Sequence, residues 1–335
     1  MYLEIEHTLS LGYDAYIRES FLELRMQPKS TADQTLQSFV LAVGPPTRIA
    51  RYRDWNGNAV HHFTIVHFHD RIEVVARSAV STHPSQPILD RITDPRPFPE
   101  PPYPLLDFLA FDGPVRSSAA LRMFSQAVAA SPSAPLGELV AACGRHIREH
   151  LTYRKNVTRY DSTTDDFLDA GAGVCQDFTH LMLGLLRLRR IPCRYVSGYL
   201  HVGPHEGEAA QSHAWIEFHA PSAGWVPFDP THDREVDERY VVVGHGRHYD
   251  DVPPNKGIYR GNAREVLRSE VRTQESSPKD ISALHEEMEQ IDLPVYQEVP
   301  ERRGDRLRRA AEELAARERE QDQQQEQQQR GRSGR

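Results

Sequence analysis

Apolar and polar residues alternate over several short stretches in the first quarter of the chain. A period of two, carried by β-branched and aromatic residues, is typical of half-buried strands. It marks four segments: Tyr2–Leu9, Gln37–Val43, His61–His69 and Ile72–Val80. Turn residues separate them, and Asn56-Gly57-Asn58 is a good hairpin signal. The pattern predicts a small antiparallel sandwich that forms an N-terminal β-rich domain over residues 1–83.

Prolines then recur from Pro84 to Pro104. Proline fixes its own backbone angle and restricts the preceding residue, so a proline-rich stretch is stiff and extended. We therefore predict a linker over residues 84–104 and a domain boundary there.

Helical spacing replaces alternation after this linker. It predicts helices over Val115–Ala130, over Leu136–His150 and from about Cys175 to Arg190, with a short helix capped by Thr163 or Thr164. Strands follow at Cys193–Leu200, Ser212–Phe218, Trp225–Phe228 and Tyr240–Val243. Helices first and antiparallel strands afterwards indicate an α+β domain over residues 105–275.

The chain changes composition beyond about residue 276. Residues 301–335 are rich in Arg, Glu and Gln and hold almost no large apolar side chain. This composition favours a polar helical or disordered tail over residues 276–335. A partner-binding coiled coil is the alternative, although no heptad of apolar positions is sustained there.

Charge and hydropathy exclude several classes of protein. The net charge is −8 with both signs dispersed, so the basic footprint of a nucleic-acid-binding protein is missing. No apolar run approaches the roughly 20 residues that a membrane-spanning helix needs. The N-terminus MYLEIEHTLS has acidic residues early and no apolar core, unlike a secretory signal. We expect a cytoplasmic protein without membrane or nucleic-acid partners.

Cys175 is the first candidate for chemistry. The three cysteines, Cys143, Cys175 and Cys193, are odd in number and widely spaced, which argues against a disulfide framework. Cys175 lies in GAGVCQDFTHLMLGLL, where two glycines precede the start of a helical pattern. Free N–H groups and the helix dipole at such a start favour a thiolate and could stabilise an oxyanion. Taken alone, a buried core cysteine is the commoner explanation.

His213 and Asp229 lie on two successive predicted strands. In SHAWIEFHA, alternation puts His213 on the face opposite to Ala214, Ile216 and Phe218. In GWVPFDPTH, Asp229 is likewise opposite to the apolar face. A turn between the strands would bring imidazole and carboxylate together, and the carboxylate would then orient the ring. Each residue also has an ordinary structural explanation, but the three together predict a Cys-His-Asp triad.

The cluster of His61, His62, His67 and His69 suggests a metal site as one alternative. His67 and His69 would share a strand face, but acids in a matching arrangement are missing. The pattern therefore favours an exposed polar strand over a metal site. We expect neither a metal nor a cofactor.

These motifs together resemble the transglutaminase-like superfamily in its bacterial branch. The resemblance rests on GVCQDFTHLMLGLLRLRRIPCRYVSGYL, SHAWIEF and GWVPFDPTH, and HTLSLGYD and YRDWNGNAVHHF resemble the β-domain that precedes this core. It covers roughly residues 1–270. It implies a papain-like core with Cys175 as nucleophile, His213 as general base and acid, and Asp229 as orienting carboxylate.

The oxyanion donors are less well defined. The backbone N–H of Cys175 is one candidate, and Tyr153 is a second, against a structural role for its ring. Gln176 belongs to the matching motif without a derivable role. Cys193 stands where the family usually has a small residue such as Ala, and we interpret it as a buried, inert thiol.

The resemblance leaves several functions open. We favour a cysteine-dependent hydrolase of peptide or other amide bonds that passes through a thioester acyl-enzyme. A transglutaminase-type transfer to amines would use the same triad. A scaffold that keeps the fold without catalysis is a third reading, because fold does not fix function. The expected partner is a protein or peptide substrate.

Overall fold

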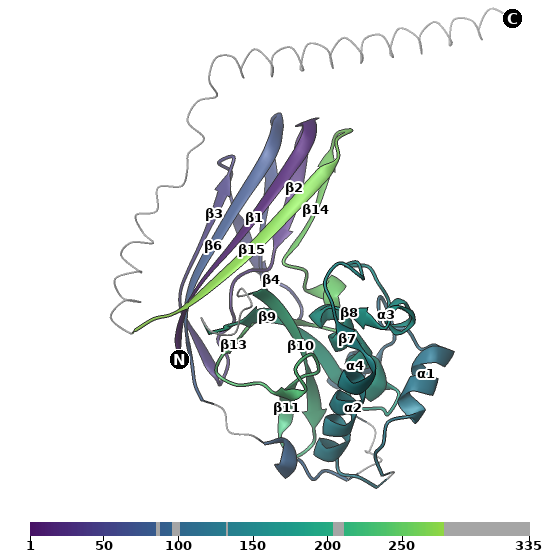
Figure 1. Ribbon diagram of the computed structural model, residues 1–335. Coiled ribbons are helices and arrows are strands. Elements are labelled where there is room, and N and C mark those ends of the chain that lie inside the picture. The colour runs from purple at the N-terminus through teal and green to yellow at the C-terminus, as the bar shows by residue number, and fades with distance from the viewer. Residues whose placement is uncertain (85–87, 96–100, 132, 204–210, 278–335) are drawn as a thin grey trace, which may run out of the picture.

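The computed structural model describes residues 1–84, 88–95, 101–131, 133–203 and 211–277. Most of the predicted tail, residues 278–335, lies outside the described residues. A β-sandwich stands on one side of the molecule and a mixed core of helices and sheet on the other (Figure 1). The predicted α+β class with an all-β N-terminal region is confirmed.

The sandwich consists of two antiparallel sheets with four strands each. The strand orders are β15-β1-β6-β3 and β14-β2-β5-β4. The strands from the N-terminal region are β1 (Tyr2–Ile17), β2 (Glu19–Leu24), β3 (Gln34–Gly44), β4 (Ala50–Arg53), β5 (Ala59–Ile65) and β6 (His69–Thr82). Alternate side chains of the long strand β1 are buried, including Leu3, Ile5, Leu9 and Leu11. The period of two in the sequence therefore corresponds to the sandwich core.

Two details of the predicted strands are wrong. The predicted strand His61–His69 is divided, because β5 ends at Ile65 and β6 begins at His69 in the other sheet. His67 lies in the turn between them, so it does not share a strand face with His69. The strands β2 and β4 were not predicted. Burial alternates along β2, but Phe21 on its outer face and Ser20 on its inner face obscure the alternation in the sequence, and all four residues of β4 are exposed.

The predicted turn at Asn56-Gly57-Asn58 joins the paired strands β4 and β5. The Asp54 carboxylate accepts hydrogen bonds from the backbone N–H groups of Asn56 and Asn58, at 3.0 and 2.9 Å. Gly57 has a φ of 72°, which glycine adopts without strain. The hairpin signal in the sequence is confirmed.

The last two strands return from the core to the sandwich. β14 (Asn255–Arg260) pairs with β2, and β15 (Glu265–Glu275) pairs with β1 over eleven residue pairs. The sequence analysis placed these strands in the domain of residues 105–275. The structure differs, because the sandwich is built from both ends of the chain.

The described residues 88–95 of the predicted linker do not form an extended spacer. Leu89 and Ile92 are buried against the core, and Leu89–Arg91 forms a short 3-10 helix. The carbonyls of Ile92 and Asp94 accept hydrogen bonds from the first N–H groups of the helix that starts at Leu136. Residues 88–95 therefore cap that helix and belong to the core.

The core packs helices on a five-stranded antiparallel sheet of order β12-β11-β10-β9-β13. The strands are β9 (Cys193–Leu200), β10 (Gln211–Ala220), β11 (Gly224–Asp229), β12 (Arg234–Glu235) and β13 (Tyr240–Gly246). The helices are α1 (Ala119–Gln126), α2 (Leu136–His150), α3 (Thr164–Ala170) and α4 (Cys175–Arg187). Short 3-10 helices cover Tyr103–Leu109 and Tyr249–Asp251, and β7 (Thr152–Tyr153) pairs with β8 (Ala172–Gly173). Helix α4 packs on β9 and β10 at the centre of this core.

Helices α1 and α4 are shorter than the sequence predicted. The hydroxyl of Ser118 accepts a hydrogen bond from the Leu121 N–H, so α1 begins after Ser118. Helix α4 ends at Arg187, and Arg190 adopts a φ of 59°. The N–H of Ile191 then bonds to the carbonyl of Leu186, which closes the helix end.

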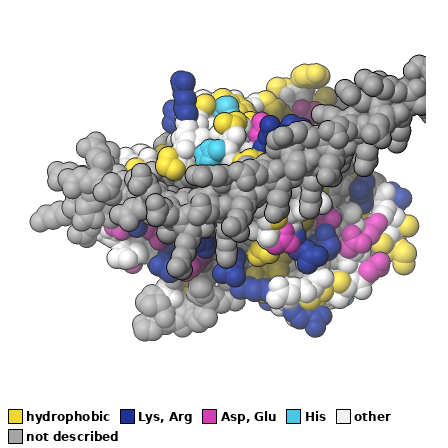
Figure 2. Space-filling view, turned by 90° about the horizontal axis from the view of Figure 1, so that it is seen from above, with side chains coloured by type: hydrophobic (Ala, Val, Ile, Leu, Met, Phe, Trp, Pro, Cys, Tyr) yellow, Lys and Arg dark blue, Asp and Glu magenta, His cyan; other side chains and the backbone are white. Residues whose placement is uncertain are grey.

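The sandwich and the core share a hydrophobic cluster. It joins Leu3 and Ile5 of β1 to Tyr199 of β9 and Val241 of β13. Figure 2 shows the molecule from above. On that side the described residues carry basic and acidic side chains intermixed with apolar ones. No helix among the described residues is long and apolar enough to cross a membrane.

Candidate functional site

Cys175 is the first residue of α4, as the sequence predicted. Gly171 ends α3 in the left-handed region with a φ of 64°, and β8 then leads the chain along β7 to the start of α4. The carboxylate of Asp177 accepts hydrogen bonds from the Val174 N–H at 2.8 Å and from the Thr158 hydroxyl at 2.6 Å. Asp177 therefore caps the helix that presents the thiol.

This cap requires a close approach of the backbone. A Cβ atom added to Gly173 would lie 2.4 Å from the Asp177 carboxylate oxygen. Asp177 is almost fully buried, and this burial raises the pKa of its carboxyl although hydrogen bonds from Thr158 and Val174 oppose the shift. Gly173 has no side chain and therefore leaves space for the Asp177 carboxylate that caps α4.

His213 lies on β10, between β9 and β11. Its position pairs with Gly198 on β9, while Ile216 pairs with Phe228 on β11. A Cβ atom at Gly198 would lie 2.5 Å from the Trp215 ring. The Trp215 ring in turn stacks beside the imidazole of His213, with ring centroids 6.1 Å apart. Packing across the sheet thus orients the imidazole.

Asp229 ends β11 and is completely buried. Its Oδ2 accepts hydrogen bonds from His213 Nε2 at 2.8 Å, from His232 Nδ1 at 2.7 Å and from the Tyr240 hydroxyl at 2.7 Å. Its Oδ1 accepts hydrogen bonds from the backbone N–H groups of Thr231 and His232. Five donors fix this carboxylate, which in turn fixes the His213 ring.

The electrostatics of the pair favour a charged imidazole. Burial by itself would lower the pKa of His213, but the charge and the hydrogen bond of Asp229, together with the nearby Cys175 thiol, raise it above the ordinary value. Burial by itself would raise the pKa of Asp229, yet His213 and His232 hold it well below its usual range. The structure therefore places the His213 ring in a hydrogen bond with Asp229 and within electrostatic reach of the Cys175 thiol.

The other candidate residues lie close to the start of α4. Tyr153 pairs with Gly173 through β7 and β8, and its ring packs on the core. Gln176 is half-buried, and its side-chain amide donates a hydrogen bond to the Tyr160 carbonyl at 2.8 Å. Neither contact tests an oxyanion role. Cys143 and Cys193 are fully buried, and burial raises the pKa of the Cys193 thiol to about 11.

Three residues around the site were not predicted from the sequence. His232 and Tyr240 bind the same carboxylate oxygen as His213. Tyr195 on β9 is buried, and its pKa is raised by burial, with the charges of Cys175, Tyr249 and Asp177 adding to the effect. His232 had a signal in the sequence, because an Asp-Pro turn directs the residues after it back to the aspartate.

Among the residues that the structure describes, two groups of side chains have metal-ligating atoms within 4.8 Å of one another. One is His146, Glu149 and His150 on α2, and the other is His213, Asp229 and His232. In the second group both imidazoles already donate to Asp229 Oδ2. That arrangement suits proton transfer without a metal.

Known proteins share this architecture. Residues 122–230 match the sequence model of the transglutaminase-like superfamily, and residues 3–81 match the bacterial transglutaminase-like N-terminal region. An uncharacterized protein of Mycobacterium leprae is 34% identical over 288 residues, covering 79% of this chain and 95% of the relative. A protein-glutamine gamma-glutamyltransferase of Pseudomonas aeruginosa is 25% identical over 164 residues, which are 44% of this chain and 24% of that protein.

A solved structure confirms the fold. It is that of a candidate cysteine protease from Cytophaga hutchinsonii, with a TM-score of 0.69 and 20% identity, covering 83% of this chain and 92% of that one. A papain-like core behind a β-sandwich is thus the class of this molecule. The chain belongs to the transglutaminase-like superfamily and carries the N-terminal region of its bacterial members. Members of the superfamily are generally enzymes, either cysteine proteases or transglutaminases.

Proposed function

We propose that this protein is a cysteine-dependent hydrolase of peptide or other amide bonds. The observation that carries the proposal is the position of His213, whose ring is hydrogen-bonded to the buried Asp229 carboxylate and lies close enough to the Cys175 thiol for that thiol to help raise the pKa of the imidazole. Acyl transfer through a thioester requires a nucleophile, a proton carrier next to it, and a carboxylate that orients the proton carrier.

The reaction has two halves. The Cys175 thiolate attacks the amide carbonyl carbon, the carbon–nitrogen bond breaks, and the His213 imidazolium gives its proton to the departing amine. A thioester joins the acyl group to Cys175. Neutral His213 then takes a proton from water, the resulting hydroxide attacks the thioester, and the carboxylic acid leaves. The proton held by His213 restores the starting ion pair.

The backbone N–H of Cys175, free at the helix start, is our first oxyanion donor, with Tyr153 and Gln176 as further candidates.

A second reaction shares the first half. If a primary amine replaces water in the attack on the thioester, the product is a new amide, as in protein cross-linking. The likeness to the Pseudomonas aeruginosa protein-glutamine gamma-glutamyltransferase supports this candidate. We favour hydrolysis, in which water is the acceptor.

Mass spectrometry of peptide mixtures separates these functions. Wild type, Cys175→Ala and the control Cys143→Ala are incubated with peptides in the presence and absence of a primary amine. We expect wild type and Cys143→Ala to release carboxylic acids, and Cys175→Ala to be inactive. Amine adducts in preference to acids would assign transfer instead. Unchanged peptides in every arm would leave only a scaffold function.

A further inference from the structure

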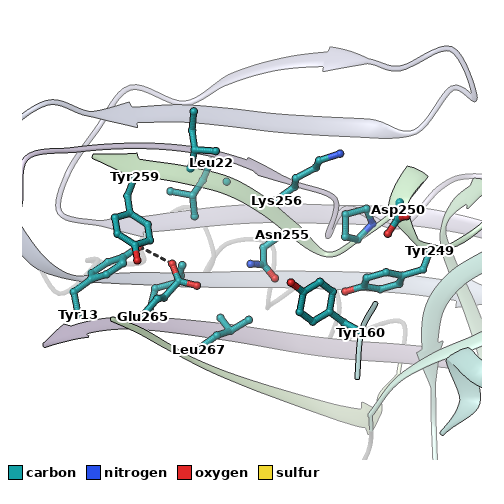
Figure 3. A pocket seen from close by; sticks show the side chains of 14 residues that line it. Tyr13, Leu22, Tyr160, Tyr249, Asp250, Asn255, Lys256, Tyr259, Glu265 and Leu267 are labelled. Carbon is teal, nitrogen blue, oxygen red and sulfur yellow. Dashed lines mark hydrogen bonds between the residues drawn. The ribbon is translucent and has the colours of Figure 1, made fainter. Parts of the chain in front are cut away.

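The open side of the sandwich contains a cavity of about 650 Å³, which is within the range of ligand-binding pockets. Figure 3 shows its lining, with Tyr160 and Tyr249 at one end and Tyr13, Tyr259 and Glu265 at the other. We name this cavity the seam groove, because it lies between β14 and β15, which are the terminal strands of their two sheets.

In a sandwich with closed edges the side chains that line the seam groove would be covered. Here some of them are exposed. Leu267 on β15 pairs with Leu11 on β1, so both side chains share the inner face of that sheet. Leu11 is 2% exposed, but Leu267 is 43% exposed. On the opposite sheet Gly257 pairs with Leu22 and contributes no side chain to the cavity, although Leu22 itself is only 3% exposed. The sandwich is therefore open along this edge.

Two contacts connect residues of the groove to residues close to Cys175. The carbonyl of Tyr160 accepts the hydrogen bond from Gln176, which is the neighbour of Cys175. The ring of Tyr249 lies 6.3 Å from that of Tyr195, whose pKa is raised in part by the charge of Cys175. Tyr160 and Tyr249 both line the groove, so its inner end lies beside the start of α4.

We propose that the seam groove binds the polypeptide substrate as an extended segment with apolar side chains at alternate positions. The inference rests on the proposed function and names the substrate class of that same site. Terminal strands offer unpaired backbone groups on their outer edges, which an extended chain can satisfy. The apolar floor of Leu11, Leu22 and Leu267 then accommodates every second side chain.

The charges of the groove support a polypeptide over a strongly charged ligand. Lys256 is positive while Asp250 and Glu265 are negative, and all three line the cavity. The Tyr13 hydroxyl donates a hydrogen bond to Glu265 at 3.0 Å, which partly satisfies this carboxylate. Mixed charges around an apolar floor fit a neutral chain of amide groups, whereas a phosphate-bearing ligand needs a concentrated positive charge.

Two adjacent residues of β15 provide a matched pair of variants. Leu267 lines the groove, while Val266 pairs with Gly12, points to the other face of the same strand and is 54% exposed. The variants Leu267→Glu and Val266→Glu therefore place the same charge on one exposed strand, inside and outside the groove. Leu267→Ser is a milder substitution at the same position.

Binding is measured by fluorescence anisotropy with the Cys175→Ala protein as background, so that no turnover interferes. The probes are two labelled synthetic peptides of equal length with a central Gln, one alternating Phe with Ser and the other Asn with Ser. We expect tighter binding of the Phe peptide, an affinity loss of about ten-fold or more in Leu267→Glu, a smaller loss in Leu267→Ser, and wild-type affinity in Val266→Glu.

Equal affinities of both peptides, or equal losses in Leu267→Glu and Val266→Glu, would overturn the groove proposal. Self-association of the protein that displaces the peptides would also overturn it, because a second copy would then be the occupant. Turnover by the wild type is a separate readout. Binding of the Phe peptide in the groove without any cleavage would contradict the proposed hydrolysis, whereas the groove proposal would remain supported.

Discussion

At the scale of single residues, the buried carboxylate of Asp229 controls the proton on His213. The carboxylate accepts hydrogen bonds from two imidazoles and one phenol, and its charge is the main influence that raises the pKa of His213 against burial. Acylation needs the charged ring, so activity is expected to persist through neutral pH. It should be lost only as the pH rises through the raised pKa.

Asp229→Asn keeps the shape of this side chain and removes its charge. An opposite charge within hydrogen-bonding distance changes a pKa by about 1–3, so the alkaline limb of kcat/KM should move down by about one to three pH units. The measurement is the pH profile of peptide hydrolysis for both proteins. Identical alkaline limbs would show that Asp229 does not set the protonation of His213.

Glu217 gives a second prediction, about stability. Burial by itself would raise the pKa of Glu217, but the imidazole of His245, 3.5 Å away, and the ion pair and hydrogen bond from Arg194 lower it to about 2. A lowered pKa means that the ionised carboxylate stabilises the fold above its unfolded value of 4.5 and loses this effect as the pH falls toward 2. Its bond to Arg194 is 2.5 Å long between Nη2 and Oε2.

Glu217→Gln should therefore lower the free energy of unfolding by roughly 3 kcal/mol at neutral pH, because it leaves the Arg194 charge without its partner. The difference should shrink as the pH is lowered below 4.5. Urea unfolding at several pH values measures it. Glu270→Gln is the control, since Glu270 pairs with Arg272 on the exposed surface, where a pair contributes at most about 1 kcal/mol. Equal effects of the two substitutions would contradict the prediction.

At the scale of elements, the start of α4 depends on the fit between Gly173 and Asp177. Gly173→Ala would force a Cβ atom to within 2.4 Å of the capping carboxylate. We expect a loss of about 1–3 kcal/mol in stability and slower alkylation of Cys175 by iodoacetamide. Gly12→Ala is the control, because its Cβ atom would meet no heavy atom closer than 4.0 Å. Wild-type alkylation in Gly173→Ala would show that the cap does not position the thiol.

The sequence predicted the elements whose signals are local. The apolar positions Phe178, Leu181, Met182 and Leu185 follow one helical face, and all are buried in the core beneath α4. Alternation in the His213 strand predicted the buried face of Ala214, Ile216 and Phe218 in the same way. The mutual approach of His213 and Asp229 followed from two neighbouring strands joined by a short turn.

Elements that depend on distant partners were not predictable. The strand β15 is exposed on both faces from Glu265 to Glu270, so its sequence shows no apolar alternation, and its partner β1 lies more than 250 residues away along the chain. The donor Tyr240 and the buried Tyr195 reach the site through strand pairing that no local pattern specifies. The cap residue Asp177 lies in the first turn of the predicted helix, but its hydrogen bond from Thr158 depends on the tertiary fold.

At the scale of the whole molecule, the return of β14 and β15 links the sandwich to the core. Tyr249 and Asp250 lie at the end of the core just before β14, and they line the same cavity as Tyr13 of β1. A substrate bound in the seam groove would therefore contact both the sandwich and the core. The order of the chain, sandwich then core then sandwich, brings Tyr249 and Asp250 of the core to one end of the groove.

Shortening the chain tests this dependence. A chain that ends at Val252 lacks β14 and β15, which leaves β1 and β2 as sheet edges and uncovers Leu9 and Leu11, now 1% and 2% exposed. Unpaired edges of that length promote association between molecules, so we expect aggregation and the loss of cooperative thermal unfolding. A chain that ends at Ser277 keeps every strand of the described fold and should melt within a few degrees of the full protein. Size-exclusion chromatography and thermal melts compare the two, and a soluble, cooperative protein ending at Val252 would show that the sandwich is complete without the returning strands.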